Sequence, residues 1–389
     1  MTGSQINLET LAQQGVDALN RGDGPEAKSA FQTIISAGRA TPQLWAFMAH
    51  ACEMAGDDAS LTSALDQILA TDSRDVLALV MRGDQFLRAG DDRAASGWYS
   101  AALRTASMAG PLPPQIARRL QIAEQALQQA NGRFELHLQN TVHATGLDLD
   151  RLNPRFTESL GILAGRQEVQ LQQPSSFYYP GLPQVAFYDT AEFDWAPALE
   201  AAFPTIRNEA AAALAGQAGI APYVQADPKR PNRGHALLGD SRWSAYHFFQ
   251  DGRPVEPNTE RCPVTSSALA KVPLPRIRAR SPMALFSILE PHTHIPPHNG
   301  MLNTRLICHL PLIVPDKCRL RVGNHTRTVE EGKVLIFDDS VEHEAWNDSD
   351  EVRVILLFEI WRPELSADEV KALTALYEAV NLYPQSESA

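Results

Sequence analysis

The chain has 389 residues, of which 44% are hydrophobic and 21% are charged. These values are ordinary for a soluble globular protein, and the length predicts two or three domains. The formal net charge of −12 argues against non-specific nucleic-acid binding and against docking on an anionic membrane surface. One local exception is the run Arg276, Arg278 and Arg280, which could be a basic site or equally a solvated edge.

The N-terminal residues lack the basic and apolar pattern of a signal peptide. No apolar run reaches the roughly 20 residues that a membrane helix requires. The cysteines are scattered and form no C-x-x-C pair, so the pattern predicts no disulfide framework and a reducing compartment; they are Cys52, Cys262, Cys308 and Cys318. We therefore expect a cytoplasmic protein.

The first hundred residues repeat with a period of 34. Gly22, Gly56 and Gly90 each precede an aspartate, and a column of small residues recurs in the same register. This column is Gly15, Ala49 and Gly83, and a column of large residues is Phe31, Leu65 and Tyr99. The period is typical of tetratricopeptide-like helical hairpins, in which small residues let paired helices approach closely. Residues 1–131 are predicted to form such an all-α solenoid, ending in a capping helix from Gln115 to Gln129.

Two interpretations of this solenoid remain open. It could offer a concave groove to a peptide or a partner protein, or it could serve self-association and packing only. The following segment, 132–174, is polar with little periodicity, and we interpret it as a connector. Within it, the residues before Pro154 are interpreted as a helix that ends at that proline.

The remaining residues, 175–389, are predicted to form a β domain. An aromatic stretch rich in proline and glycine opens it, and a helix from Trp195 to Ala215, interrupted near Pro204, follows. Residues 243–249 predict a strand, and residues 254–275 a loop with one short helix. Short strands joined by turns from Met283 onward predict a double-sheet jelly roll, also described as a double-stranded β-helix.

Two histidines and an arginine in this domain suggest a metal site. His298 follows one apolar run, His343 follows another, and Arg353 lies ten residues beyond His343. Histidines at the ends of separate strands can meet across a barrel mouth. Neutral imidazole suits Fe(II), Zn and Cu, and a buried arginine on a neighbouring strand suits a carboxylate.

The stretches HTHIPPHNGMLNTRL and EEGKVLIFDDSVEHEAWND, with Arg353 after them, resemble the aspartyl/asparaginyl β-hydroxylase family of 2-oxoglutarate-dependent oxygenases. The resemblance covers roughly residues 175 to 365. It implies that Fe(II) is bound by His298 and His343, with Gly300 of the H-x-G triplet standing where other oxygenases carry a carboxylate ligand, and with water in the vacant position. It also implies that 2-oxoglutarate and O2 are cosubstrates.

The same resemblance assigns further residues. Arg353 would hold the distal carboxylate of 2-oxoglutarate with help from Ser287, and Trp243 and His309 would lie at the cosubstrate pocket. The chain departs from the family at Ile307, which replaces an arginine. Arg305 remains, and we assign it to the substrate. Asp338 and Asp339 could supply a third ligand, but an aspartate pair at a strand end more often satisfies turn amides.

These residues lead to three hypotheses. The first is an Fe(II)- and 2-oxoglutarate-dependent dioxygenase that hydroxylates an Asp or Asn side chain of a peptide or protein, reached through the repeat groove. The second keeps the chemistry but acts on a small molecule or an acyl chain. The third is a non-catalytic interaction protein in which the solenoid is the working part. None of them requires nucleic acid or a membrane.

Overall fold

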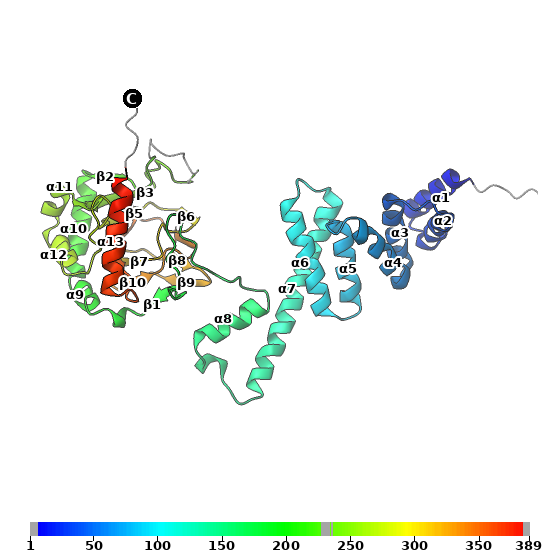
Figure 1. Cartoon of the computed structure of the whole chain (residues 1–389), viewed down its shortest axis with the longest axis horizontal. Helices are drawn as coiled ribbons and strands as arrows, with labels where there is room; N and C mark the ends of the chain where they lie inside the picture. Colours follow the sequence, from blue (N-terminus) through cyan, green and yellow to red (C-terminus); the bar gives the residue numbers. More distant parts are fainter. Residues whose placement is uncertain (1–6, 227–233, 235, 384–389) are drawn as a thin grey trace, which may run out of the picture. The chain divides into compact units, whose positions relative to one another are not determined.

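The computed structural model describes residues 7–226, 234 and 236–383 (Figure 1). The chain divides into two compact units, Met1–Glu168 and Val169–Ala389. The division falls inside the segment predicted as a connector, and each unit has its own hydrophobic core. Among the described residues, no helix is both long enough and apolar enough to cross a bilayer.

The first unit begins with three antiparallel helical hairpins, so the predicted tetratricopeptide-like repeats are confirmed. Each hairpin turns at one of the repeated glycines: Gly22, Gly56 and Gly90 have φ of 82°, 67° and 76°. The aspartate after each glycine caps the next helix by accepting a backbone N–H. The helices are α1 (Leu8–Arg21), α2 (Gly24–Ser36), α3 (Pro42–Ala55), α4 (Asp58–Thr71), α5 (Val76–Arg88) and α6 (Asp92–Met108).

The column of small residues lets a large side chain of the paired helix lie against the backbone. A Cβ built on Gly83 would overlap the ring of Tyr99, and one built on Gly15 would overlap the ring of Phe31. Both rings are buried. In the first and third hairpins, the 34-residue register therefore aligns a glycine with the aromatic ring that packs against it.

Replacing Gly83 with alanine is expected to destabilise the repeats by about 1–3 kcal/mol, because the added methyl group forces Tyr99 from its position. Gly97→Ala in α6 is the matched control, since nothing lies within 4 Å of its Cβ position. That change should be neutral or stabilising by about 0.5–1 kcal/mol. Thermal unfolding followed by far-ultraviolet circular dichroism distinguishes the two; equal melting curves for both variants would contradict the prediction.

Two predictions for the segment after the repeats are wrong. The capping helix continues past Gln129 as α7 (Pro114–His143). Ala130 and Glu135 are buried in this part of the helix, and Arg133, Glu135 and Gln139 are good helix formers. The residues just before Pro154 do not form the predicted α-helix; instead Pro154 begins α8 (Pro154–Leu163), with Asn153 as its N-cap. Proline is well suited to the first helical turn, where its missing N–H is not needed. A single 3-10 turn, Leu149–Arg151, lies between them.

The second unit contains two antiparallel sheets, which confirms the jelly-roll prediction. The larger sheet has the order β1-β10-β7-β12-β5-β3-β2 with β4 beside β3, and the smaller has the order β6-β11-β8-β9. The strands are β1 (Phe187–Tyr188), β2 (Ile220–Pro222), β3 (Trp243–Gln250), β4 (Arg253–Pro254), β5 (Ala284–Leu289), β6 (Thr293–His298), β7 (Arg305–Ile313), β8 (Cys318–Val322), β9 (His325–Thr328), β10 (Leu335–Phe337), β11 (His343–Asn347) and β12 (Arg353–Trp361).

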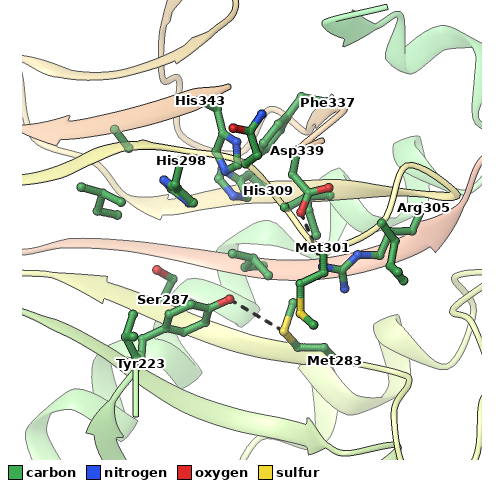
Figure 2. Close-up of a pocket in the computed structure, with 18 of the residues that line it drawn as sticks. Tyr223, Met283, Ser287, His298, Met301, Arg305, His309, Phe337, Asp339 and His343 are labelled. Carbon is green, nitrogen blue, oxygen red and sulfur yellow. Dashed lines mark hydrogen bonds and ion pairs between the residues drawn. The ribbon is translucent and has the colours of Figure 1, made fainter. Parts of the chain in front are cut away.

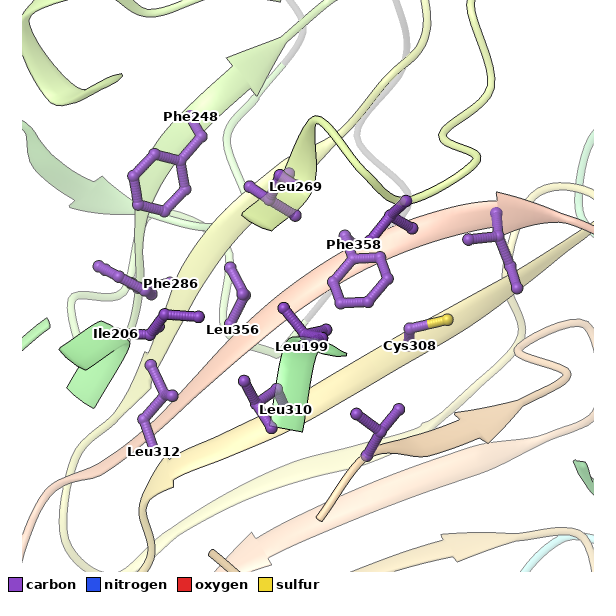
Figure 3. Packing of buried hydrophobic residues seen from close by; sticks show 14 of the residues in the cluster. Leu199, Ile206, Phe248, Leu269, Phe286, Cys308, Leu310, Leu312, Leu356 and Phe358 are labelled. Atoms are coloured by element: carbon purple, nitrogen blue, oxygen red, sulfur yellow. The ribbon is translucent and has the colours of Figure 1, made fainter. Parts of the chain in front are cut away.

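Helices cover the larger sheet on the side away from the smaller one. The predicted break near Pro204 is present, and the loop 254–275 holds two short helices where one was predicted. Leu199, Ile206 and Leu269 pack from these helices onto Phe286, Leu310 and Phe358 (Figure 3). The helices of this unit are α9 (Ala196–Ala201), α10 (Phe203–Gly216), α11 (Glu256–Arg261), α12 (Pro263–Leu269) and α13 (Ala367–Leu382), with a 3-10 turn at Thr190–Glu192.

The central strands are buried on both faces, which explains their continuous apolar runs. In β12, Val354, Leu356 and Phe358 join the core under the helices, whereas Ile355 and Leu357 join a second core between the sheets. Strand alternation therefore directs every other residue of β5, β7 and β12 into the space between the two sheets.

Candidate active site

A cavity of about 580 Å³ lies between the two sheets (Figure 2). All the residues that the sequence analysis assigned to the site line it, although they come from six strands. These are Trp243, Ser287, His298, Arg305, His309, His343 and Arg353. Its size falls in the range of roughly 300–1,000 Å³ that is typical of small-ligand pockets.

His298 and His343 face each other across neighbouring strands. They are paired residues of β6 and β11, and their ring centroids lie 4.1 Å apart. The Nδ1 atoms bond to the carbonyls of Pro296 at 2.8 Å and Val341 at 3.1 Å. Donation from Nδ1–H places the lone pair on Nε2, the arrangement that metal-bound histidines use. Burial, with a smaller contribution from His298, lowers the pKa of His343 to about 3, so its imidazole is neutral.

Arg353 provides a buried cation at the inner part of the cavity. The side chain is 2% exposed, and its Nε and Nη2 have no hydrogen-bond partner among the described residues. Burial lowers its pKa to about 10, so the guanidinium remains charged at neutral pH. A buried guanidinium without a carboxylate is costly unless a ligand supplies one. This observation fits a bound carboxylate such as that of 2-oxoglutarate.

The other predicted cosubstrate residues surround the same space. Trp243 Nε1–H donates to Ser287 Oγ at 3.1 Å, and both side chains are buried. His309 is 5% exposed, and its Nδ1 has no partner among the described residues. Burial, Arg353 and His343 together hold the pKa of His309 well below its usual range. The Ser287 hydroxyl, the His309 imidazole and the Arg353 guanidinium therefore line the same cavity as His298 and His343.

Asp339 occupies the space beside Gly300 that a side chain would fill. A Cβ at Gly300 would overlap the Asp339 carboxylate, so the position of Asp339 requires a glycine in the H-x-G triplet. The carboxylate is 5% exposed, and burial raises its pKa to about 7 despite the nearby Arg305. Across the described ranges, no three His, Cys, Asp or Glu side chains have metal-binding geometry. His298, His343 and Asp339 line the same cavity.

Asp339→Asn is expected to stabilise the metal-free protein above pH 7 by a few kcal/mol. The pKa of this carboxyl is about 7 in the folded state and roughly 3.9 in the unfolded state. The folded state therefore retains the proton longer, and the wild type loses stability as pH rises from about 4 to about 7. Urea unfolding of both proteins at pH 4 and pH 8 measures this difference. A constant difference across the pH range would contradict it.

Arg305, assigned to the substrate, is already paired with two acidic groups. It contacts Glu359, whose side chain is fully buried, and its Nη2 lies 3.5 Å from Asp339 Oδ2. Ile307, the next inward residue of β7, contributes an apolar surface to the cavity. The cavity wall at this point is therefore nearly neutral overall.

Several residues that line the outer part of the cavity carry no motif signal in the sequence. Met283, Met301 and Tyr223 lie there, with a Tyr223 hydroxyl to Met283 sulfur contact of 3.8 Å (Figure 2). Methionine side chains adapt to irregular apolar ligands. Tyr223 also stacks on Trp243 at 4.3 Å between ring centroids. Tyr223 precedes the strand that carries Trp243, so no local motif in the sequence could indicate its place.

The fold and site define a jelly-roll protein with two facing histidines in the same cavity as a buried arginine. A family model described as "Aspartyl/Asparaginyl beta-hydroxylase" matches residues 200–363. The ornithine lipid ester-linked acyl 2-hydroxylase of Rhizobium tropici is 38% identical over 220 residues, which are 55% of this chain and 72% of that protein. The chain therefore belongs to the aspartyl/asparaginyl β-hydroxylase family, a family of hydroxylating enzymes.

Two other similarities cover smaller parts of this chain. The human aspartyl/asparaginyl beta-hydroxylase is 35% identical over 189 residues, which are 48% of this chain but only 24% of the human protein. The structural match to the tetratricopeptide domain of Sgt2 from Aspergillus fumigatus covers 33% of this chain and 84% of the Sgt2 chain, with 17% identity and a TM-score of 0.28. A TM-score this low supports no conclusion about the repeats beyond their own geometry.

Proposed function

We propose that the protein is an Fe(II)- and 2-oxoglutarate-dependent dioxygenase. The reaction converts a C–H group, O2 and 2-oxoglutarate into the corresponding alcohol, succinate and CO2. The observation that carries the proposal is the buried Arg353, whose Nε and Nη2 have no partner among the described residues, in the same cavity as two facing histidines. That combination suits a redox-active metal together with a small dicarboxylic acid.

In this proposal each residue has a defined task. His298 and His343 hold Fe(II) through Nε2, and their Nδ1 bonds to backbone carbonyls fix the ring orientations. Arg353 and Ser287 hold the distal carboxylate of 2-oxoglutarate, beside His309 and Trp243. Bound iron supplies the activation of O2 that the side chains cannot provide. The apolar walls exclude water from the reacting centre.

Succinate formation tests the proposal. Purified protein with Fe(II), 2-oxoglutarate, ascorbate and O2 is expected to release succinate slowly without substrate, and His343→Ala is expected to abolish this release. Tight coupling to substrate would suppress turnover in both proteins, so Fe(II) and 2-oxoglutarate binding is measured on the same samples. Failure of the wild type to bind either would overturn the proposal and leave the repeats as the functional part.

Two substrate classes have support from different observations. An Asp or Asn side chain of a polypeptide is favoured by the name of the human relative and by the repeats, whose fold commonly binds peptides. An acyl chain is favoured by the Rhizobium relative, by Ile307 in place of an arginine, and by the neutralised Arg305. Succinate release with acidic peptides and with fatty acyl amphiphiles, compared at equal concentration, distinguishes the two classes.

The proposed compartment is a reducing one such as the cytoplasm. All four cysteines are free and buried, which is compatible with the scattered pattern seen in the sequence.

A further inference from the structure

We infer that the outer face of the second unit docks on an anionic lipid surface and delivers an acyl chain into the cavity. The inference deepens the proposed function, because the delivery of a chain has meaning only if the cavity hydroxylates it. The docking face consists of a hairpin formed by residues 276–281, here called the arginine hairpin, and the exposed side of the C-terminal half of α13.

The arginine hairpin is an ordered projection. Ile277 and Ser281 bond to each other through both backbone N–H groups, each at 3.0 Å, which places Arg278 and Ala279 at the tip. From α13, Asn381 Nδ2 donates to the carbonyl of Arg278 at 3.1 Å. The backbone N–H of Arg278 donates to Glu378 at 3.1 Å. These bonds hold the basic residues beside the helix.

The adjoining side of α13 exposes apolar side chains. Leu373 and Tyr377 face the core, but Leu376 and Val380 are 43% and 59% exposed. Tyr383, just after the helix, is 78% exposed. These side chains form a short exposed apolar strip, and its burial in a lipid interface would be favourable. A free apolar strip beside a basic hairpin is the combination that an anionic amphiphile matches.

This face is continuous with the active-site cavity. A second cavity of about 440 Å³ is lined by Leu376 and Val380, and it shares four lining residues with the first. The shared residues are Ala279, Arg280, Met301 and Asn381. Met301, 43% exposed, lies at the junction, and Met283 continues the apolar wall inward. A flexible apolar chain can therefore pass from the exposed face to the histidines along one lined path.

The charges around the hairpin favour an anion. Arg276 and Arg278 are exposed, and Arg280 is half-buried with its guanidinium 4.7 Å from the centroid of the Tyr377 ring. Among the described residues, two acidic side chains border them: Glu378, which accepts the Arg278 N–H, and Asp251 at the cavity rim. The local balance is basic although the whole chain carries −12. Because salt screens charges beyond roughly 10 Å, the local balance governs contact with a surface.

Vesicle sedimentation with the full chain tests the inference without iron or 2-oxoglutarate. Binding is expected to vesicles of phosphatidylcholine with phosphatidylglycerol and not to vesicles of phosphatidylcholine alone. Arg276→Ala/Arg278→Ala should weaken binding by about thirtyfold, at about fivefold for each arginine. The matched control, Lys317→Asn/Arg327→Ala, removes two exposed positive charges from residues next to and within the four-stranded sheet and should leave binding unchanged.

A second variant tests the apolar strip. Leu376→Ser/Val380→Ser changes exposed side chains only and should weaken binding to the anionic vesicles while retaining the fold by circular dichroism. Absence of vesicle binding, equal loss in the control variant, or arginine-dependent binding of a soluble acidic peptide instead would overturn the inference. Because Fe(II) and 2-oxoglutarate binding is measured separately, failure of docking and failure of the proposed chemistry give different results.

Discussion

Replacing Arg353 with methionine is expected to weaken 2-oxoglutarate binding by roughly 30-fold to several thousandfold, the cost of removing one partner from a buried charge pair. The methionine fills similar space but cannot donate a hydrogen bond to a carboxylate. His298 and His343 are untouched by the change, so Fe(II) affinity should be retained. Isothermal titration of each ligand into the protein under nitrogen measures both quantities separately.

The same substitution should stabilise the protein when neither metal nor cosubstrate is bound. Burial lowers the pKa of Arg353, which means that the charged form is disfavoured in the folded state at neutral pH. Arg353→Met should therefore raise the melting temperature of the empty protein and abolish the further rise that 2-oxoglutarate causes in the wild type.

Two comparison variants sharpen this test. Arg353→Lys keeps the charge but loses the planar fork, so its 2-oxoglutarate affinity should lie between those of the other two proteins. Arg319→Met removes an arginine that lies outside the cavity and is 40% exposed, and it should bind 2-oxoglutarate as the wild type does. Unchanged affinity in Arg353→Met would place the carboxylate elsewhere.

The repeats and the sheets were predictable because their signals are local and periodic. Gly22, Gly56 and Gly90 recur in one register and sit at positive φ in the structure. Strands such as β12 read as apolar runs because both faces are buried. The helix boundaries near Pro154 were not predictable in the same way, because proline is compatible with the start of a helix as well as with its end.

The candidate site was predictable only in part. His298, His343 and Arg353 carry motif signals, and the fold brings them to one cavity. The pairing of Arg305 with Glu359 was not foreseen, since 54 residues separate them and only the register of β7 with β12 places them together. The contact of Asp339 with Gly300 likewise depends on tertiary structure. Sequence spacing therefore indicates candidate site residues more readily than it indicates the charged residues that pair with them.

Asp338 differs from its neighbour Asp339 in having every partner within the protein. Arg362 Nη1 lies 2.8 Å from its Oδ2, and both side chains are fully buried. Gln172 Nε2 donates to the same oxygen at 2.7 Å, and the Ser340 backbone and hydroxyl donate to Oδ1. The structural interpretation made from the sequence is therefore confirmed for Asp338. This network fixes the loop that leads into β11 and hence to His343.

Asp338→Ala is expected to destabilise the second unit by about 3 kcal/mol. It removes the fully buried carboxylate 2.8 Å from Arg362 and, among the described residues, leaves that charge with only the partly exposed Glu364, 3.3 Å from its Nε. Asp348→Ala is the matched control: its pair with Arg319 is about 40% exposed on both sides, and its loss should cost less than about 1 kcal/mol. Hydrogen exchange of β7 and β12 reports this unit separately from the repeats. Asp338→Leu/Arg362→Met should recover part of the loss, since the buried guanidinium is then absent. Equal protection in the two single variants would show that the loop before His343 is held by packing and not by the buried ion pair.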